Sequence, residues 1–441
     1  MNARIFFWSL TSALAGFLFG FDTVVISGAE KTIQTLWGLS PELHGIAMGS
    51  ALYGTVIGSL IGGWPADRFG RKATLLWIGV LYFVGAVGSG LAPNVATFIA
   101  ARFIGGLGIG ISTVVAPMYI SEIAPPQHRG RLAGMFQFNI VFGILIAFVS
   151  NALLAGIGEN AWRWMLGVAA FPSFLYTVFC FGLPESPRWL LSRKGDRDAA
   201  LQVLKRVQPE LPETEIAAEA EEIATASSEQ VSSGHFWTRR LRKPILLAVL
   251  IAFFNQLSGV NVILYFAPRI FELAGLGAQA ALLKSVGIGV TNFVFTLVGL
   301  WLIDRLGRRT LLYIGSFGYI ASLSLVAWAF FTGHYSLVPI CVFAFIASHA
   351  IGQGAVIFVF ISEIFPNRHR AEGQALGSFT HWIFAALLTT LAPKMFDVFR
   401  PGYIFSFFAG MMVLQLIWVK KRVPETKGIP LEQIQKQLGV E

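Results

Sequence analysis

The chain has 441 residues, of which 55% are hydrophobic and only 13% are charged, and its net charge is +9. A soluble protein of this length needs far more polar surface, so the composition excludes that class and indicates a membrane protein with many spans. The two cysteines, Cys180 and Cys341, both lie in apolar segments, so they imply neither a disulfide framework nor a metal site. The chain has no Gly-x-x-x-x-Gly-Lys-Ser/Thr motif, so transport driven by nucleotide hydrolysis is not expected.

Apolar segments between charged, proline or glycine breaks predict the membrane spans. A helix needs roughly 20 apolar residues to cross a bilayer. The segments lie at about 6–29, 44–64, 73–92, 95–117, 132–155, 162–183, 244–271, 281–303, 310–332, 336–360, 373–396 and 401–419. We therefore predict an all-α polytopic membrane protein with twelve transmembrane helices. The first segment is too long for a removed signal peptide and lacks a small-residue cleavage pattern.

The basic residues predict the orientation in the membrane. Most of the 33 Lys and Arg residues fall in segments on the same side as both termini, including those between Arg188 and Lys243. This asymmetry predicts cytoplasmic N- and C-termini. It also accounts for the net positive charge, so we expect no nucleic-acid partner. The short loops are typical of a protein of the bacterial inner membrane.

An internal repeat organises the chain. Its motifs are Asp67-Arg-Phe-Gly-Arg-Lys72 with Asp304-Arg-Leu-Gly-Arg-Arg309, Ser121-Glu-Ile-Ala-Pro125 with Ser362-Glu-Ile-Phe-Pro366, and Pro184-Glu-Ser with Pro424-Glu-Thr. They recur after a nearly constant offset, which predicts two pseudo-symmetric six-helix halves. We expect the substrate to bind between the halves, near the midplane. The predicted domains are the halves 1–183 and 244–422, a cytoplasmic helical linker at 184–243 and a cytoplasmic tail at 423–441.

These motifs carry a family resemblance over nearly the whole chain. The most specific are Gly20-Phe-Asp-Thr-Val-Val-Ile-Ser-Gly28, Arg102-Phe-Ile-Gly-Gly106, Pro184-Glu-Ser-Pro-Arg-Trp-Leu190, Gln256-Leu-Ser-Gly-Val-Asn261 and Pro424-Glu-Thr-Lys-Gly428. The chain resembles the sugar porter family of the major facilitators. That family includes bacterial proton–sugar symporters and animal glucose facilitators.

Amide side chains in apolar segments are candidates for binding a sugar. They are Gln137, Asn255, Gln256, Asn261 and Asn292. A carboxamide offers donors and an acceptor to sugar hydroxyls without adding net charge. On a continuous helix, Gln256 and Asn261 lie about 140° apart, so both can border one cavity. The alternative is that these amides only form hydrogen bonds between helices.

The resemblance assigns further roles around the sugar. It implies that Gln137, Gln256, Asn261 and Asn292 contact hydroxyls and that Trp382 supplies an aromatic wall. It also implies that Phe19 and Gly354 border the pocket and that Tyr265 belongs to an outer gate.

Three positions depart from the usual pattern of that family. Asn255 replaces a common glutamine, Phe358 a frequent tryptophan, and His381 an asparagine or glutamine. The tenth segment, around Gly352–Phe358, also lacks the usual prolines. These departures leave the sugar open. His381 is either a second titrating group or a neutral histidine that bonds the sugar, and we favour the second interpretation.

Two isolated charges in apolar segments, Asp22 and Arg102, predict a proton site. A carboxylate in a spanning helix costs roughly 2.5 kcal/mol or more, and such residues usually mark an ion or proton pathway. The resemblance implies the same pair, because its symporters carry aspartate at the Asp22 position and its facilitators commonly carry asparagine. The alternative is a permanent structural ion pair.

Repeated charged motifs predict a latch that holds the cytoplasmic side closed. Gly70 and Gly307 permit the tight turns of the two loops. We expect inter-helix salt bridges among Asp67, Arg71, Glu122, Arg129, Glu185, Asp304, Arg308, Glu363, Arg370 and Glu425. The alternative is that these charges only set the topology, which does not explain the repeated glutamates.

The predicted function is import of a monosaccharide, with glucose the first candidate, by proton symport. The alternatives are a proton-independent facilitator and a non-transporting sugar sensor; the short tail after the last span argues against the sensor. The seven histidines show no metal-ligand spacing and no nucleophile–base pair is evident. We therefore expect no enzyme, cofactor or metal. The expected partners are the sugar, a proton and the lipid bilayer, with the protein a monomer.

Overall fold

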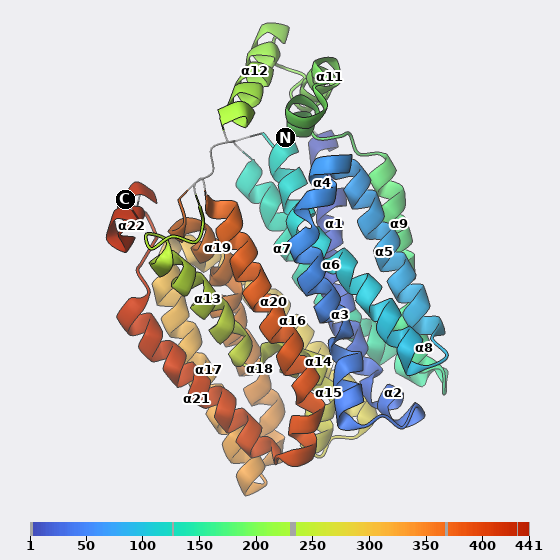
Figure 1. Cartoon of the computed structure of the whole chain (residues 1–441). Helices are drawn as coiled ribbons and strands as arrows, with labels where there is room; N and C mark the ends of the chain where they lie inside the picture. Colours follow the sequence, from blue (N-terminus) through green and yellow to red (C-terminus); the bar gives the residue numbers. More distant parts are fainter. Residues whose placement is uncertain (1–2, 126–127, 230–234, 367–368, 430, 441) are drawn as a thin grey trace. The chain divides into compact units, whose positions relative to one another are not determined.

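A computed structural model describes residues 3–125, 128–229, 235–366, 369–429 and 431–440. The regular elements in these ranges are all helices, as Figure 1 shows. Twelve of the described helical stretches are long and apolar enough to cross a membrane, with mean hydropathy from 1.2 to 2.4. The predicted fold class is therefore confirmed.

The first of two compact units comprises Met1–Asp22, Gly54–Gly143 and Leu166–Gly234. The helices wholly within it are α4 (Gly63–Phe69), α5 (Arg71–Leu91), α6 (Val95–Ile123), α9 (Ala170–Phe181), α10 (Pro187–Trp189), the π-helical η3 (Leu190–Lys194), α11 (Arg197–Val207) and α12 (Glu213–Glu229). Within this unit α5 packs against α6 and α9. The polar linker helices α11 and α12 pack on each other through Leu204, Ile216 and Ala220.

The second unit comprises Thr23–Tyr53, Ile144–Met165 and His235–Glu441. Its helices are η1 (Ile26–Gly28), α2 (Glu30–Leu36), η2 (Ala155–Ile157), α13 (Arg242–Leu257), α14 (Val260–Tyr265), α15 (Ala267–Leu273), α16 (Ala278–Leu306), α17 (Arg308–Thr332), η4 (Tyr335–Leu337), α18 (Val338–His349), η5 (Ala350–Gly354), α19 (Ala355–Ile364), α20 (Arg370–Val398), α21 (Pro401–Arg422) and α22 (Leu431–Leu438). Here α17 packs against α18 and α21, and α13 against α20.

Four helices have residues in both units. They are α1 (Ala3–Val25), α3 (Pro41–Ile61), α7 (Arg129–Leu154) and α8 (Ala161–Gly167). The division into halves 1–183 and 244–422 rests on the internal repeat and stays a prediction.

Two spans contain breaks that position side chains. Gly259 has φ 84° and separates α13 from α14, so the predicted continuous helix through Gln256 and Asn261 is wrong. A left-handed residue ends a helix, and glycine adopts this conformation without steric cost. In the tenth span, the π-helical turn η5 interrupts the helix although no proline lies there. Gly352 in η5 allows close packing, because a Cβ there would lie 2.8 Å from the Cα of Gly315 on α17.

Candidate functional site

A network of amides and one histidine lies at the break between α13 and α14. Asn261 Nδ2 donates to Gln256 Oε1 at 2.7 Å, and Gln256 Nε2 donates to Asn255 Oδ1 at 3.0 Å. Gln256 Nε2 also lies 3.1 Å from Nε2 of His381 on α20. The turn at Gly259 brings Asn261 back to Gln256, so the two meet directly instead of pointing 140° apart. The structure thus joins four predicted sugar-site residues in one network.

Aromatic rings surround His381. Its ring centroid lies 4.7 Å from that of Trp382, edge to face, and 5.6 Å from that of Phe358. An amide nitrogen only donates, so the His381 nitrogen that bonds Gln256 accepts and carries no proton. This geometry favours the neutral histidine over a titrating one.

The other predicted sugar-site residues lie on separate elements. In the second unit, Asn292 is on α16, buried Tyr265 ends α14, and Gly354 ends η5 with its Cβ position 3.4 Å from the ring of His349. In the first unit, Phe19 is on α1 and Gln137 is on α7. Their role at a common sugar site stays a prediction.

Asp22 and Arg102 form a buried ion pair within the first unit. Arg102 Nη1 donates to Asp22 Oδ1 at 2.6 Å, and Nη2 donates to the Asp22 carbonyl at 3.1 Å. The residues are only 7% and 2% exposed. Among the described residues, Asp22 Oδ2 has no hydrogen-bond partner. Only one of the two carboxylate oxygens of Asp22 is therefore shown bonding Arg102.

The first predicted latch is a network centred on Arg71. Its guanidinium donates to both carboxylate oxygens of Glu122, at 2.9 and 3.0 Å, and to Asp67 at 3.2 Å. Glu185 accepts from the backbone N–H groups of Arg71 and Lys72 at 2.8 and 3.1 Å. Burial raises the pKa of the Glu185 carboxyl above its ordinary value, although these N–H donors oppose the shift.

The same network recurs around Arg308 in the second unit. Its guanidinium donates to Glu363 at 2.7 and 3.0 Å and to Asp304 at 3.1 Å, while its backbone N–H donates to Glu425 at 2.9 Å. Gly307 has φ 90°, and a Cβ there would lie 2.6 Å from Glu425 Oε2. The first network has the same design, since Gly70 has φ 95° and its Cβ position lies 2.2 Å from Glu185 Oε2.

The networks correct part of the predicted latch. The bonds that the structure shows for Glu185 and Glu425 go to backbone N–H groups, at the starts of α5 and α17 and in the loops that follow each glutamate, instead of to the guanidinium groups expected. A carboxylate at this place is favoured because the first N–H groups of a helix lack partners within it. The side chain of Arg129 lies outside the described residues. Arg370 begins α20.

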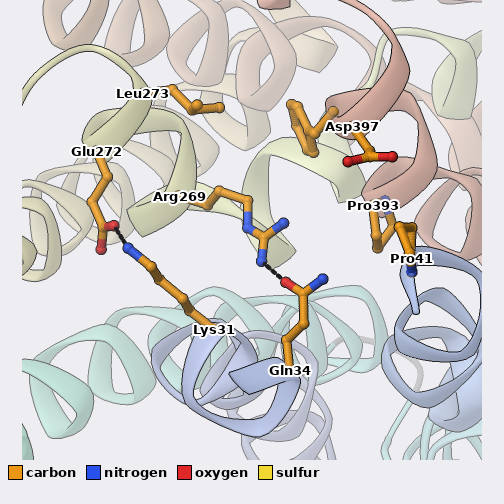
Figure 2. A pocket seen from close by; sticks show the side chains of 9 residues that line it. Lys31, Gln34, Pro41, Arg269, Glu272, Leu273, Pro393 and Asp397 are labelled. Carbon is orange, nitrogen blue, oxygen red and sulfur yellow. Dashed lines mark hydrogen bonds and ion pairs between the residues drawn. The ribbon is translucent and has the colours of Figure 1, made fainter. Parts of the chain in front are cut away.

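Sequence reasoning missed a charged cluster at the other end of the second unit. Figure 2 shows Lys31 paired with Glu272, and Arg269 bonded to Gln34. They line a cavity of about 370 Å³ together with Pro41, Leu273, Pro393, Phe396 and Asp397. Arg269 Nε also donates to Glu30 Oε1 at 2.8 Å. In the sequence these charges lie near the ends of apolar segments, where nothing distinguishes them from ordinary loop charges.

Comparison with known proteins covers nearly all of the chain. The family described as "Sugar (and other) transporter" matches residues 8–438. The arabinose-proton symporter of Bacillus subtilis is 34% identical over 437 residues, which cover 97% of this chain and 94% of that protein. The glucose transporter GlcP of Staphylococcus epidermidis is 35% identical over 447 residues, covering 99% and 98%. The solved inward-open, partially occluded structure of the xylose transporter XylE from E. coli has a TM-score of 0.87 at 31% identity, covering 97% of this chain and 100% of that one.

Proposed function

Since this chain belongs to the family of sugar (and other) transporters, we propose that it imports a monosaccharide by symport with protons. It is a multi-pass membrane protein. We infer a bacterial cell membrane as its location, with both termini in the cytoplasm, and a monomer as the transporting unit.

The buried pair of Asp22 and Arg102 carries the proposal of proton coupling. Taking a carboxylate out of water favours its protonated form, whereas a guanidinium at 2.6 Å favours the ionised form. A motion that changes this distance therefore loads or releases a proton. The second oxygen of Asp22, Oδ2, has no hydrogen-bond partner among the described residues, which supports this proposal. The name of one relative, the arabinose-proton symporter of Bacillus subtilis, also supports proton coupling.

The amide network supports a monosaccharide as substrate. Asn255, Gln256 and Asn261 present neutral donors and acceptors, and Trp382 and Phe358 flank His381 with aromatic rings. Such a site pairs sugar hydroxyls and covers C–H faces without binding so tightly that release fails. The relatives are named for arabinose, glucose and xylose, so we take glucose as the first substrate to test.

Facilitated diffusion is the second candidate. It follows if Asp22 and Arg102 remain a permanent ion pair throughout the cycle, because the amide network needs no proton to bind a sugar. The short distance and the near-complete burial of both residues are compatible with such a pair.

Uptake into proteoliposomes separates these functions. Labelled glucose, xylose and arabinose are offered with and without an inward proton gradient. We expect accumulation above equilibrium only with the gradient, at about tenfold per pH unit for one proton per sugar. If the sugar only equilibrates across the membrane, at a level that does not depend on the proton gradient, the protein is a facilitator.

The variant Asp22→Asn locates the coupling. It should lose accumulation and keep sugar exchange across the membrane, because the amide network is unchanged. The matched control Asp198→Asn alters an exposed aspartate on α11 and should behave as the wild type. If Asp22→Asn instead abolishes sugar binding, Asp22 is not a separate proton site.

A further inference from the structure

A buried carboxylate, Glu30, lies between a histidine and an arginine at one end of the second unit. Glu30 Oε2 is 2.9 Å from Nε2 of His44 on α3, and its Oε1 accepts from Arg269 of α15. Glu30 is 1% exposed and His44 is fully buried. This end lies opposite Arg308, because α16, roughly 43 Å long, separates Glu272 from it. In the proposed topology it is the outer end.

The three residues come from different copies of the internal repeat. Glu30 lies on α2 after the first span and His44 lies near the start of the second span, whereas Arg269 lies on α15 after the seventh span. At this end α3 touches α20, because Lys394 Nζ pairs with Glu42 Oε1 at 3.0 Å and a Cβ at Gly45 would lie 1.9 Å from the carbonyl oxygen of Thr390. In an alternating-access cycle, we expect opening of this end to separate Arg269 from Glu30, because they belong to different copies of the repeat, and to leave His44 beside Glu30, because these two belong to the same copy.

The charges around Glu30 set up a competition. In the closed arrangement, Arg269 neutralises the Glu30 carboxylate. A proton on His44 would add a second cation to a buried carboxylate, and like charges in a buried site repel strongly. Once Arg269 has left, His44 is the polar partner that remains, and its proton can then neutralise Glu30.

The lysines near Glu30 have partners of their own, so they do not replace Arg269 or His44 as partners of Glu30. On the same elements, Lys31 is paired with Glu272, and Gln34 bonds Arg269. From α20, Lys394 pairs with Glu42 at 3.0 Å, and Asp397 lines the cavity. The ring of Phe266 lies against His44, with centroids 6.5 Å apart. Among the described residues, His44 Nδ1 is buried without a partner, so only Glu30 is shown bonding this imidazole.

We propose that Glu30 and His44 form a second proton-binding site, separate from Asp22, from which Arg269 expels the proton when the outer end closes. This inference rests on the proposed function in one respect: the transport cycle must open the two ends of the protein in turn. Its consequence is that external acid holds the outer end open. This site therefore opposes closing at low external pH, whereas the gradient acting on Asp22 drives import.

Distances between spin labels at the outer end test the proposal without a transport assay. Labels are placed at exposed Leu36 on α2 and exposed Leu273 on α15 after both native cysteines are replaced. The full chain in proteoliposomes is measured between about pH 8 and about pH 5, the range in which histidine changes charge. We expect acid to shift the ratio of open to closed populations by roughly fivefold or more.

Variants assign that shift to the proposed site. His44→Gln keeps a donor to Glu30 but cannot titrate, so it should abolish the acid-induced opening, and Arg269→Gln should leave the end open at every pH. The control His334→Gln changes an exposed histidine and should retain the wild-type shift. An unchanged shift in His44→Gln, or no shift in the wild type, overturns the proposal. Asp22→Asn should not alter the acid-induced shift in the label distances. If the wild type shows this shift but no gradient-driven uptake, only the proposed symport is overturned.

Discussion

Adding one methyl group at Gly45 should hinder closing of the outer end. Gly45 lies on α3, and a Cβ there would be 1.9 Å from the carbonyl oxygen of Thr390 on α20. Ordinary contact begins at 3.4 Å, so α3 and α20 must separate by about 1.5 Å to accept alanine. The obstacle is backbone, which cannot move aside as a flexible side chain can. Overpacking of this kind costs about 1–3 kcal/mol, which disfavours the closed arrangement roughly 5- to 150-fold.

Sugar exchange across proteoliposomes measures this effect, because each exchange event requires both ends to close. Gly45→Ala should slow exchange by a factor in that range while the protein still binds sugar offered from outside. The control is Gly410→Ala on α21, where an added Cβ meets no atom within 4 Å. Both variants make the same change in a spanning helix, so helix propensity affects them equally. Equal exchange rates for the two would refute the reasoning.

Three further results are expected. Glu122→Gln should lower the Tm more than Glu363→Gln, because the Glu122 side chain is 7% exposed and that of Glu363 is 21% exposed; equal losses would contradict this. Burial raises the pKa of Glu185, so the folded state binds this proton more tightly than the unfolded state, and stability is lost as the pH rises from about 4.5. In thermal unfolding at several pH values, Glu185→Gln should remove that contribution, and an unchanged pH dependence would exclude it. Gln256→Ala should raise the sugar concentration for half-maximal exchange about 2- to 10-fold, the effect of one net hydrogen bond, and an unchanged value would remove Gln256 from the site.

Much of the molecule follows from local properties of the sequence. The spans are predictable because apolar length alone decides whether a helix can cross a bilayer. The pair of Asp22 and Arg102 is predictable because a lone charge in such a segment needs a partner, and the chain offers few. The positive φ values of Gly70 and Gly307 follow from the repeated turn motif in the same way.

The partners within the latch and the sugar site were less predictable. Glu122 and Arg71 are far apart in the sequence, and nothing local shows that Glu185 bonds backbone N–H groups rather than a guanidinium. The helical spacing of Gln256 and Asn261 predicted that both border one cavity, but it did not predict that the turn at Gly259 makes them hydrogen-bonded neighbours. A single residue with positive φ changes the direction of the helix, and spacing arguments fail beyond it.

The amino-acid sequence by itself determined the membrane class, the twelve spans, the internal repeat and the family, because each depends on composition or on motifs read in order. Only the tertiary structure decided that Glu30 lies between His44 and Arg269 and that Gln256 reaches His381. The physical reason is that a polar residue near the end of a span can either face water or form a buried pair. Which of the two it does depends on whether the fold places a partner beside it. Packing of distant helices brings that partner, and local sequence carries no record of it.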